Sequence, residues 1–340
     1  MFDERWPDDA EELAAALASL LDKHCPREVV RSAEDTNGND SGLDTALNDF
    51  GLWELGSDPY LLTRAAVVIG SYLAPVPFVA AAPAIAVLSR TDTANGIDRD
   101  LVPPLPAVVV AHDDGVALTS AALPPRRTSG GEYVVDLREL QTEDAEVVAD
   151  TLALAAMRSL GLLLEAARLV GAGETLLRDC VRYVSERHQF GQPIGAFQGV
   201  SHPLAEVATA LQAADLLVRK AAFLADPNYG GTGTPPMHAA AMAAHKARSA
   251  SRLAATVGHQ VLGGYGFTLE ADCQLYSRRI RAWSTMMPDP SAALADLART
   301  LADPTHRETV RDLWQFDHGF TLPGWAAEID KTGPQPNRPR

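Results

Sequence analysis

Residues 183–204 read YVSERHQFGQPIGAFQGVSHPL and contain a helix end, a break and a second helix start in quick succession. Arg187 lies where the first helix is predicted to end, Phe190 and Gly191 interrupt it, and the next helix is predicted to begin near Ala196. The first N–H groups of that helix lack partners, so with a cation beside them the corner can hold an anion. On these residues alone, a plain helix–helix turn with Phe190 in the core is the simpler interpretation.

A second turn, rich in glycine, lies at residues 260–268, which read QVLGGYGFT. Three glycines just beyond a long helix allow positive φ angles and a close approach of the backbone to a ligand. The Gln260 amide offers both a donor and an acceptor. Helix ends of this kind are common, so the turn by itself is weak support for a ligand site.

The hydrophobic pattern predicts a mainly α protein that a short β segment interrupts. Residues 1–100 carry apolar positions at helical spacing and are predicted to form a helical domain. Residues 101–145 are predicted to form a small β module. Helical periodicity returns over residues 146–302, and residues 303–340 are a predicted tail with three aromatic anchors, Trp314, Phe316 and Trp325.

Individual elements can be predicted within these segments. Asp8 and Asp9 are expected to cap the first helix. Residues 107–112 and 115–120 are predicted strands, because an Asp-Asp-Gly turn separates two β-branched runs. An Ala-rich helix is predicted over residues 237–262.

Composition excludes several classes of partner. The net charge of −15 argues against nucleic acid, which requires a basic surface. No signal peptide is visible, and prolines interrupt the most apolar stretch, residues 64–89, so no membrane span is expected. Cys25, Cys180 and Cys273 are scattered without metal-ligand spacing, which predicts reduced thiols in the cytoplasm and no metal site.

Taken in order along the chain, these motifs resemble the acyl-CoA dehydrogenase family. The resemblance covers residues 150–300 and includes the two turns, Lys246 between them and the Arg278-Arg279-Ile-Arg281 run beyond them. It implies an N-terminal helical domain, a central β domain and a C-terminal four-helix bundle. It also implies FAD at a subunit interface and the α,β-dehydrogenation of an acyl-CoA.

The resemblance also assigns cofactor-binding positions. Those that contact FAD from one subunit correspond to Arg187, Gln189, Phe190, Ile194 and Gln198. Those that contact it from the neighbouring subunit correspond to Gln260, Gly263 and Gly264. No residue is expected to bind a metal.

The catalytic base of the family has no counterpart here. The family places a Glu at one of two positions, which correspond to Met287 and Gly161 in this chain, and neither side chain can accept a proton. Asp289 lies two residues from the first position and Glu165 one helical turn beyond the second. Both are weak candidates for a base, and for each a structural carboxylate is the simpler interpretation.

The β module lacks two further features of the family. No Glu-Pro…Gly-Ser-Asp segment and no Trp-Ile-Thr segment, which hold the flavin ring, occurs between residues 100 and 146. The chain therefore resembles the shorter, non-catalytic subunit of actinobacterial α2β2 acyl-CoA dehydrogenases that act on steroid side chains. This implies a full-length partner subunit that carries the Glu, an acyl-CoA substrate, and electron-transfer flavoprotein or another acceptor.

Two alternatives stay open from the sequence. The first is a self-sufficient homo-oligomeric flavoenzyme that uses Glu165 or Asp289 as its base. The second is a non-enzymatic scaffold on the same fold, which would bind no flavin in any assembly.

Overall fold

The structure is a computed structural model that describes residues 5–36, 40–88, 108–112, 115–119, 126–134 and 146–303. The chain divides into two compact units, Met1–Leu294 and Ala295–Arg340. The contacts discussed below lie within the first unit. The predicted tail with Trp314, Phe316 and Trp325 lies outside the described residues.

The N-terminal segment is helical, as predicted. Its elements are α1 (Asp8–His24), α2 (Arg27–Ala33), α3 (Ser41–Asp49), η1 (Leu52–Glu54), α4 (Pro59–Tyr72) and α5 (Phe78–Leu88). The predicted caps of α1 are wrong, because Pro7 is the N-cap residue and the aspartates Asp8 and Asp9 lie in the first turn. There their charges still oppose the positive end of the helix dipole.

The β module is small. β1 (Val108–His112) pairs with β2 (Gly115–Thr119), which confirms both predicted strands, although residues 113–114 lie outside the described chain. β2 also pairs with β5 (Glu146–Ala149), just beyond the expected end of the module. β3 (Arg126–Arg127) and β4 (Tyr133–Val134) form a separate hairpin.

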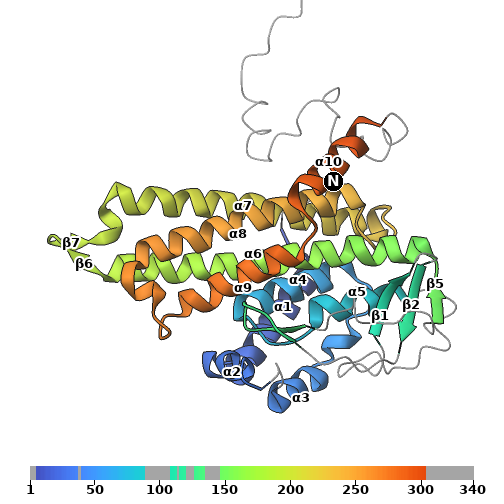
Figure 1. Ribbon diagram of the computed structural model, residues 1–340, viewed down its shortest axis with the longest axis horizontal. Helices are drawn as coiled ribbons and strands as arrows, with labels where there is room; N and C mark the ends of the chain where they lie inside the picture. The colour runs from blue at the N-terminus through green and yellow to red at the C-terminus, as the bar shows by residue number, and fades with distance from the viewer. Residues whose placement is uncertain are drawn as a thin grey trace, which may run out of the picture. The chain divides into compact units, whose positions relative to one another are not determined.

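Long helices make up the C-terminal segment. They are α6 (Thr151–Glu186), α7 (Gln198–Ala225), α8 (Met237–Leu262), α9 (Asp272–Met286) and α10 (Pro290–Ala302). Between them lie β6 (His188–Gln189), β7 (Gln192–Pro193), η6 (Ile194–Ala196), η7 (Pro227–Tyr229) and η8 (Gly263–Phe267). The bounds of α8 confirm the predicted Ala-rich helix. Figure 1 shows α6 and α8 running in one direction and α7 in the other.

Small residues allow α6 to pack closely on both sides. A Cβ added to Gly70 of α4 would lie 2.0 Å from the carbonyl oxygen of Arg168, and one on Gly171 would lie 2.0 Å from that of Val67. The two backbones are therefore in direct contact where α4 crosses α6. On the α8 side, buried alanines face α6, and Ser251 Oγ donates a hydrogen bond of 2.8 Å to the Leu169 carbonyl. One continuous core therefore joins the N-terminal helices to the bundle.

Glu174 of α6 is expected to cost stability above pH 6. Its burial, together with the nearby charge of Asp215, raises the pKa of the Glu174 carboxyl from its ordinary value of 4.5 to about 6. Between these pH values the folded chain binds more protons than the unfolded chain, so stability falls as pH rises. Glu174→Gln should therefore stabilise the chain at pH 8 by up to about 2 kcal/mol, and much less at pH 4.5. Thermal unfolding of both proteins across this range measures the difference, and a constant gain at every pH would contradict the assignment.

Candidate functional site

The first turn is a β-hairpin that joins α6 to α7. Arg187 is the C-cap of α6, and its carbonyl accepts a 2.8 Å hydrogen bond from the Ile194 N–H. At the tip, Phe190 has φ 55° and Gly191 has φ 82°. A left-handed conformation costs a non-glycine residue roughly 1–2 kcal/mol. The turn therefore holds the Phe190 ring in a strained, 90% exposed position.

Phe190 is not a core residue, which excludes the plain-turn interpretation of this ring. It lies edge-on to Phe197, with ring centroids 6.0 Å apart and an interplanar angle of 89°. Gln189 and Gln198 are exposed, and Ile194 is half-buried beside the hairpin. A flat apolar face and two amides are thus presented outward from the end of the bundle.

Charge and free donors accompany this hairpin. Arg187 is exposed, and no hydrogen bond or ion pair engages its guanidinium within the described chain. The N-cap of α7, Phe197, provides no side-chain cap. The first N–H groups of α7 are therefore available to an anion, and Gly199 adds no side chain that would cover them. A phosphate group fits these donors.

The second turn follows α8. Gly263 has φ 56° and ψ −138°, a combination that is essentially restricted to glycine. Cβ atoms added to Gly263 or Gly264 would meet no atom of the described residues within 4 Å, whereas one on Gly266 would lie 2.9 Å from the Leu262 Cβ. Gly266 is thus explained by packing and Gly263 by its backbone angles. Neither packing nor backbone angles explain the glycine at position 264 within the described chain. Because it has no side chain, the backbone there is accessible to a ligand or another subunit.

The two turns lie at the same end of the bundle. The rings of Tyr183 and Tyr265 stack with centroids 6.1 Å apart and an interplanar angle of 14°. Figure 1 shows why: α6 and α8 run in the same direction, so both end on the side of the β6–β7 hairpin. We expected the turns to serve a flavin from two different subunits. Their placement at one end of one chain allows a single ligand to contact both, and their use by two subunits stays a prediction.

Supporting contacts position the exposed side chains. Gln260 is exposed at the end of α8, next to His259, whose ring stacks on Phe267 with centroids 4.5 Å apart. His259 Nε2 also hydrogen-bonds Ser277 Oγ of α9 at 2.8 Å. Burial and the nearby charge of Arg281 lower the pKa of His259. A neutral imidazole therefore braces the glycine-rich turn against α9.

An apolar groove of about 530 Å³ lies beside the hairpin, between α6 and α7. Val181 and Val184 line it from α6, and Leu204 and Ala208 from α7. Pro193 and Ala196 extend the lining into the hairpin and η6. The groove is thus continuous with the first turn.

Of the two positions where the family has its Glu, Gly161 is half-buried and Met287 is buried. A Cβ on Gly161 would lie 3.7 Å from Pro83 Cγ of α5, and Met287 is buried at the end of α9. Glu165 is engaged by Arg168, with Nη2–Oε2 2.7 Å. Asp289 Oδ1 accepts hydrogen bonds from the N–H groups of Ser291 and Ala292 at 3.0 Å, and so caps α10. Their use as bases stays a prediction.

The expected absence of a metal site and of a membrane-spanning helix can be checked only over the described residues. There, no cluster of His, Cys, Asp or Glu has the arrangement of a metal site. Nor is any helix in that part long and apolar enough to cross a bilayer. Cys25, Cys180 and Cys273 are free and buried, and burial raises the pKa of each thiol.

Sequence reasoning did not identify Tyr183, Tyr265 and Gly199 as parts of this site. Gly199 had a signal, because it follows Gln198 in the first turn of a helix, where a glycine is unfavourable. No sequence signal predicts the Tyr183–Tyr265 contact, since it depends on the relative direction of α6 and α8.

Comparison with known proteins identifies the fold. Residues 154–286 match the family "Acyl-CoA dehydrogenase, C-terminal domain". Over 334 residues the chain is 27% identical to the acyl-CoA dehydrogenase IpdE2 of Mycobacterium tuberculosis, covering 86% of this chain and 96% of that protein.

Solved structures show the same architecture. A chain of the ChsE4–ChsE5 complex from Mycobacterium tuberculosis superposes with a TM-score of 0.75 at 20% identity, covering 88% of this chain and 99% of that one. A chain of a variant of the Tcur3481–Tcur3483 steroid ACAD does so with a TM-score of 0.73 at 19% identity, covering 87% and 98%.

Proposed function

We propose that the chain is a non-catalytic subunit of an FAD-dependent acyl-CoA dehydrogenase, because residues 154–286 match the C-terminal domain of that family and the chain has its fold. It contributes to an FAD site at the interface with a full-length subunit, which carries the catalytic Glu. The observation that supports this most directly is the pairing of two outward-facing turns at one end of the bundle. One carries an unengaged arginine and the other an open glycine backbone.

The side chains of this end fit parts of a dinucleotide. Arg187 and the first N–H groups of α7 suit a pyrophosphate. The Gln198 and Gln260 amides suit the polar edges of the adenosine. Gly263 and Gly264 let the backbone approach closely. FAD, when bound, supplies the hydride acceptor, while this chain binds and orients it.

Two similar structures support a proposal for the assembly and the substrate class. One similar structure is a complex of two named chains, ChsE4 and ChsE5, and another is titled a steroid ACAD. We therefore propose an α2β2 heterotetramer that dehydrogenates an acyl-CoA, with a steroid side-chain CoA ester as the substrate class. The electrons then pass to electron-transfer flavoprotein or a comparable acceptor.

Co-expression tests this function. The chain is produced alone and together with a full-length acyl-CoA dehydrogenase that carries the catalytic Glu, and flavin absorbance and acyl-CoA oxidation are measured. We expect one flavin per pair of subunits and activity only in the pair. Stoichiometric flavin and full turnover in the isolated chain would instead show a self-sufficient enzyme. Absence of flavin from every assembly would show a scaffold.

Gly264→Ala separates ligand binding from folding. A methyl group here meets no described atom of the chain, so the stability of the isolated chain should stay within about 0.5 kcal/mol of the original. In the pair it should weaken FAD binding about tenfold, because the cofactor loses its close approach. Gly266→Ala is the matched control, since its methyl collides with Leu262 and should lower the stability of the isolated chain itself. Unchanged FAD affinity in the Gly264→Ala pair contradicts the assignment.

A further inference from the structure

Two neighbouring helices, α8 and α9, are almost free of acidic residues. The whole sequence has 44 Asp and Glu against 29 Lys and Arg, and its net charge is −15. The 26 residues of α8 include no Asp or Glu. The 15 residues of α9 include only Asp272, which is paired with Arg27 and Arg31 of α2. These two helices therefore form a basic region on an acidic chain.

Contacts between α8 and α9 show which of their side chains lie opposite one another. Arg248 of α8 donates a hydrogen bond to the Ser284 carbonyl of α9. Further along α8, His259 Nε2 hydrogen-bonds Ser277 Oγ of α9 at 2.8 Å. The later residue of α8 thus meets the earlier residue of α9, so the two helices run antiparallel and face each other along these stripes.

Arg252 and Arg281 lie between these two contacts, and we call them the arginine pair. Arg252 is one turn beyond Arg248 on α8, and Arg281 is one turn beyond Ser277 on α9. Residues one turn apart share a face of a helix, so both arginines lie on the stripes along which the helices meet. Both are exposed, which places their guanidinium groups at the solvent edge of the α8–α9 contact.

The arginine pair is not compensated from within the described chain. There, no hydrogen bond or ion pair engages the guanidinium of Arg252 or of Arg281. Burial and the charge of Arg252 lower the pKa of Arg248, which Asp289 raises in part. Burial and the charge of Arg281 lower the pKa of His259. Two like charges are thus held close together with their hydrogen-bond donors free.

A carboxylate surface on another protein fits the arginine pair better than a free anion does. Neither arginine lines the apolar groove between α6 and α7, and both are exposed, so a free anion would gain little from two solvated groups. A carboxylate on a docked protein is held in place by the rest of the interface, which raises its effective concentration. Arg281 acts on His259, which adjoins Gln260 of the second turn, so the pair is continuous with the proposed FAD interface.

We propose that Arg252 and Arg281 bind a carboxylate-bearing patch of the partner subunit beside the second turn, and so select the partner that completes the FAD site. The inference rests on the proposed function and extends it to the choice of partner. Because the chain as a whole is acidic, most of its surface repels an acidic protein. The arginine pair therefore also sets the orientation in which such a partner docks.

Charge reversal tests the arginine pair in the assembled subunits. Arg252→Glu and Arg281→Glu are each introduced into this chain, and sedimentation measures its association with a full-length acyl-CoA dehydrogenase that carries the catalytic Glu. We expect each change to weaken association about 10- to 100-fold, because a carboxylate then faces a carboxylate. Added salt should weaken association of the original pair more than that of either variant.

Arg158→Glu is the matched control for net charge. Arg158 is exposed on α6, and within the described chain no hydrogen bond or ion pair engages it. The change alters the net charge as much as either reversal does, but away from α8 and α9. Equal weakening by this control would mean that only the overall charge matters, and would overturn the proposal.

Unfolding of the isolated chain tests whether the two arginines are adjacent. Arg252→Glu should unfold at a higher temperature than the original chain, because the new carboxylate faces Arg281 and a repulsion is replaced by an attraction. A lower unfolding temperature would contradict the arrangement of the arginine pair. This measurement does not depend on the partner subunit.

The remaining outcomes separate this proposal from the proposed function. If the subunits associate and bind flavin but neither reversal weakens association, the arginine pair does not select the partner and the proposed function stands. Unchanged association with weaker binding of FAD would show that the arginines hold a ligand phosphate, which also overturns the proposal. If the original chain neither associates with a full-length subunit nor binds flavin with it, the proposed function itself fails.

Discussion

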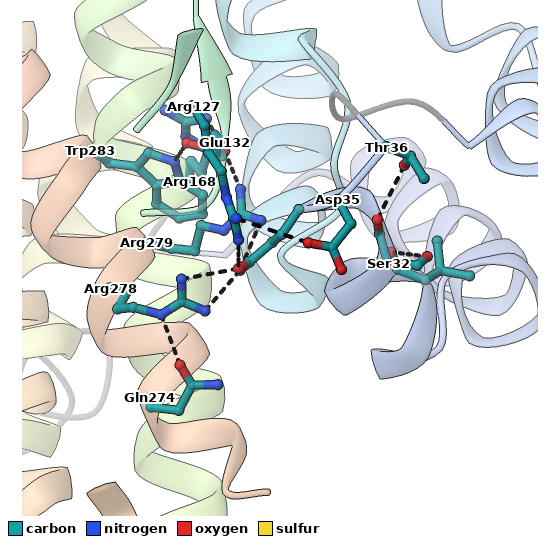
Figure 2. Close-up of polar contacts among 12 residues, drawn as sticks. Ser32, Asp35, Thr36, Arg127, Glu132, Arg168, Gln274, Arg278, Arg279 and Trp283 are labelled. Carbon is teal, nitrogen blue, oxygen red and sulfur yellow. Dashed lines mark hydrogen bonds and ion pairs between the residues drawn. The ribbon is translucent and has the colours of Figure 1, made fainter. Parts of the chain in front are cut away.

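Glu34→Ala is expected to destabilise the isolated chain by about 1–3 kcal/mol, the range for leaving buried hydrogen-bonding groups without a partner. The Glu34 carboxylate is 8% exposed and accepts hydrogen bonds from Arg278 at 2.8 and 3.1 Å and from Arg127 at 2.8 Å. Arg279 Nη2 lies 3.7 Å away and is buried. Figure 2 shows the Arg127, Arg278 and Arg279 side chains gathered in one region. Without the Glu34 carboxylate, Arg278 loses its ion-pair partner, Arg279 keeps Glu132, and Arg127 keeps only a 3.9 Å contact with Asp35.

Denaturant unfolding of the isolated chain measures this effect. Glu28→Ala is the matched control, because Glu28 is exposed on α2, a short distance before Glu34. The control should change stability by less than about 0.5 kcal/mol. If both variants unfold at the same denaturant concentration, the contacts of Glu34 with Arg127 and Arg278 do not contribute to stability by joining α2, the β3–β4 hairpin and α9.

The stability that the Glu34 carboxylate contributes also depends on pH. Burial alone would raise the pKa of this carboxyl, but the hydrogen bonds and charges of Arg278, Arg127 and Arg279 outweigh it and hold the pKa below its ordinary value of 4.5. As pH falls below 4.5, the unfolded chain takes up protons before the folded one, so the stabilisation is lost. The difference in stability between the original chain and Glu34→Gln should therefore have its full size at pH 7. It should shrink as the pH falls below 4.5.

Local sequence was sufficient for the helices and for the two turns. The ends of α6 and α8 follow from the change of pattern at Arg187 and at Gly263, and the Ala-rich run predicts α8 with its correct bounds. The ordered motifs, read together, also identified the family. Each of these signals involves residues that are close in the chain, where periodicity and glycine have direct structural consequences.

Contacts between distant segments could not be predicted in this way. Glu34 and Arg278 are 244 positions apart, and nothing near either residue indicates the other. Likewise, Glu132 lies in a short β-hairpin whose docking on α9 depends on Gly130 and Gly131 fitting against atoms of Ala282 and Glu34. The sequence alone therefore indicated that the base is missing, but not that Glu34 and Glu132 join segments far apart in the chain.

Arg187→Met should weaken FAD binding by the pair about 10- to 100-fold. A hydrogen bond to a charged group contributes about 1.5–3 kcal/mol, and methionine keeps the length of the side chain without the charge. The Arg187 guanidinium has no partner among the described residues, so the stability of the isolated chain should change by less than about 0.5 kcal/mol. The FAD dissociation constant of the flavin-depleted pair measures the first effect, and thermal unfolding of the isolated chain the second.

Arg182→Met provides the matched control for this measurement. Arg182 is exposed on α6 just over one turn before Arg187 and pairs with Asp179 at 2.9 Å. The Arg182→Met substitution removes the same charge from the same helix, but not at the β6–β7 hairpin. Equal weakening by both variants would mean that Arg187 acts only through the general field of the surface. Weakening by Arg187→Met alone, with Arg187→Lys intermediate, requires a directional contact, because lysine keeps the charge and loses the planar fork.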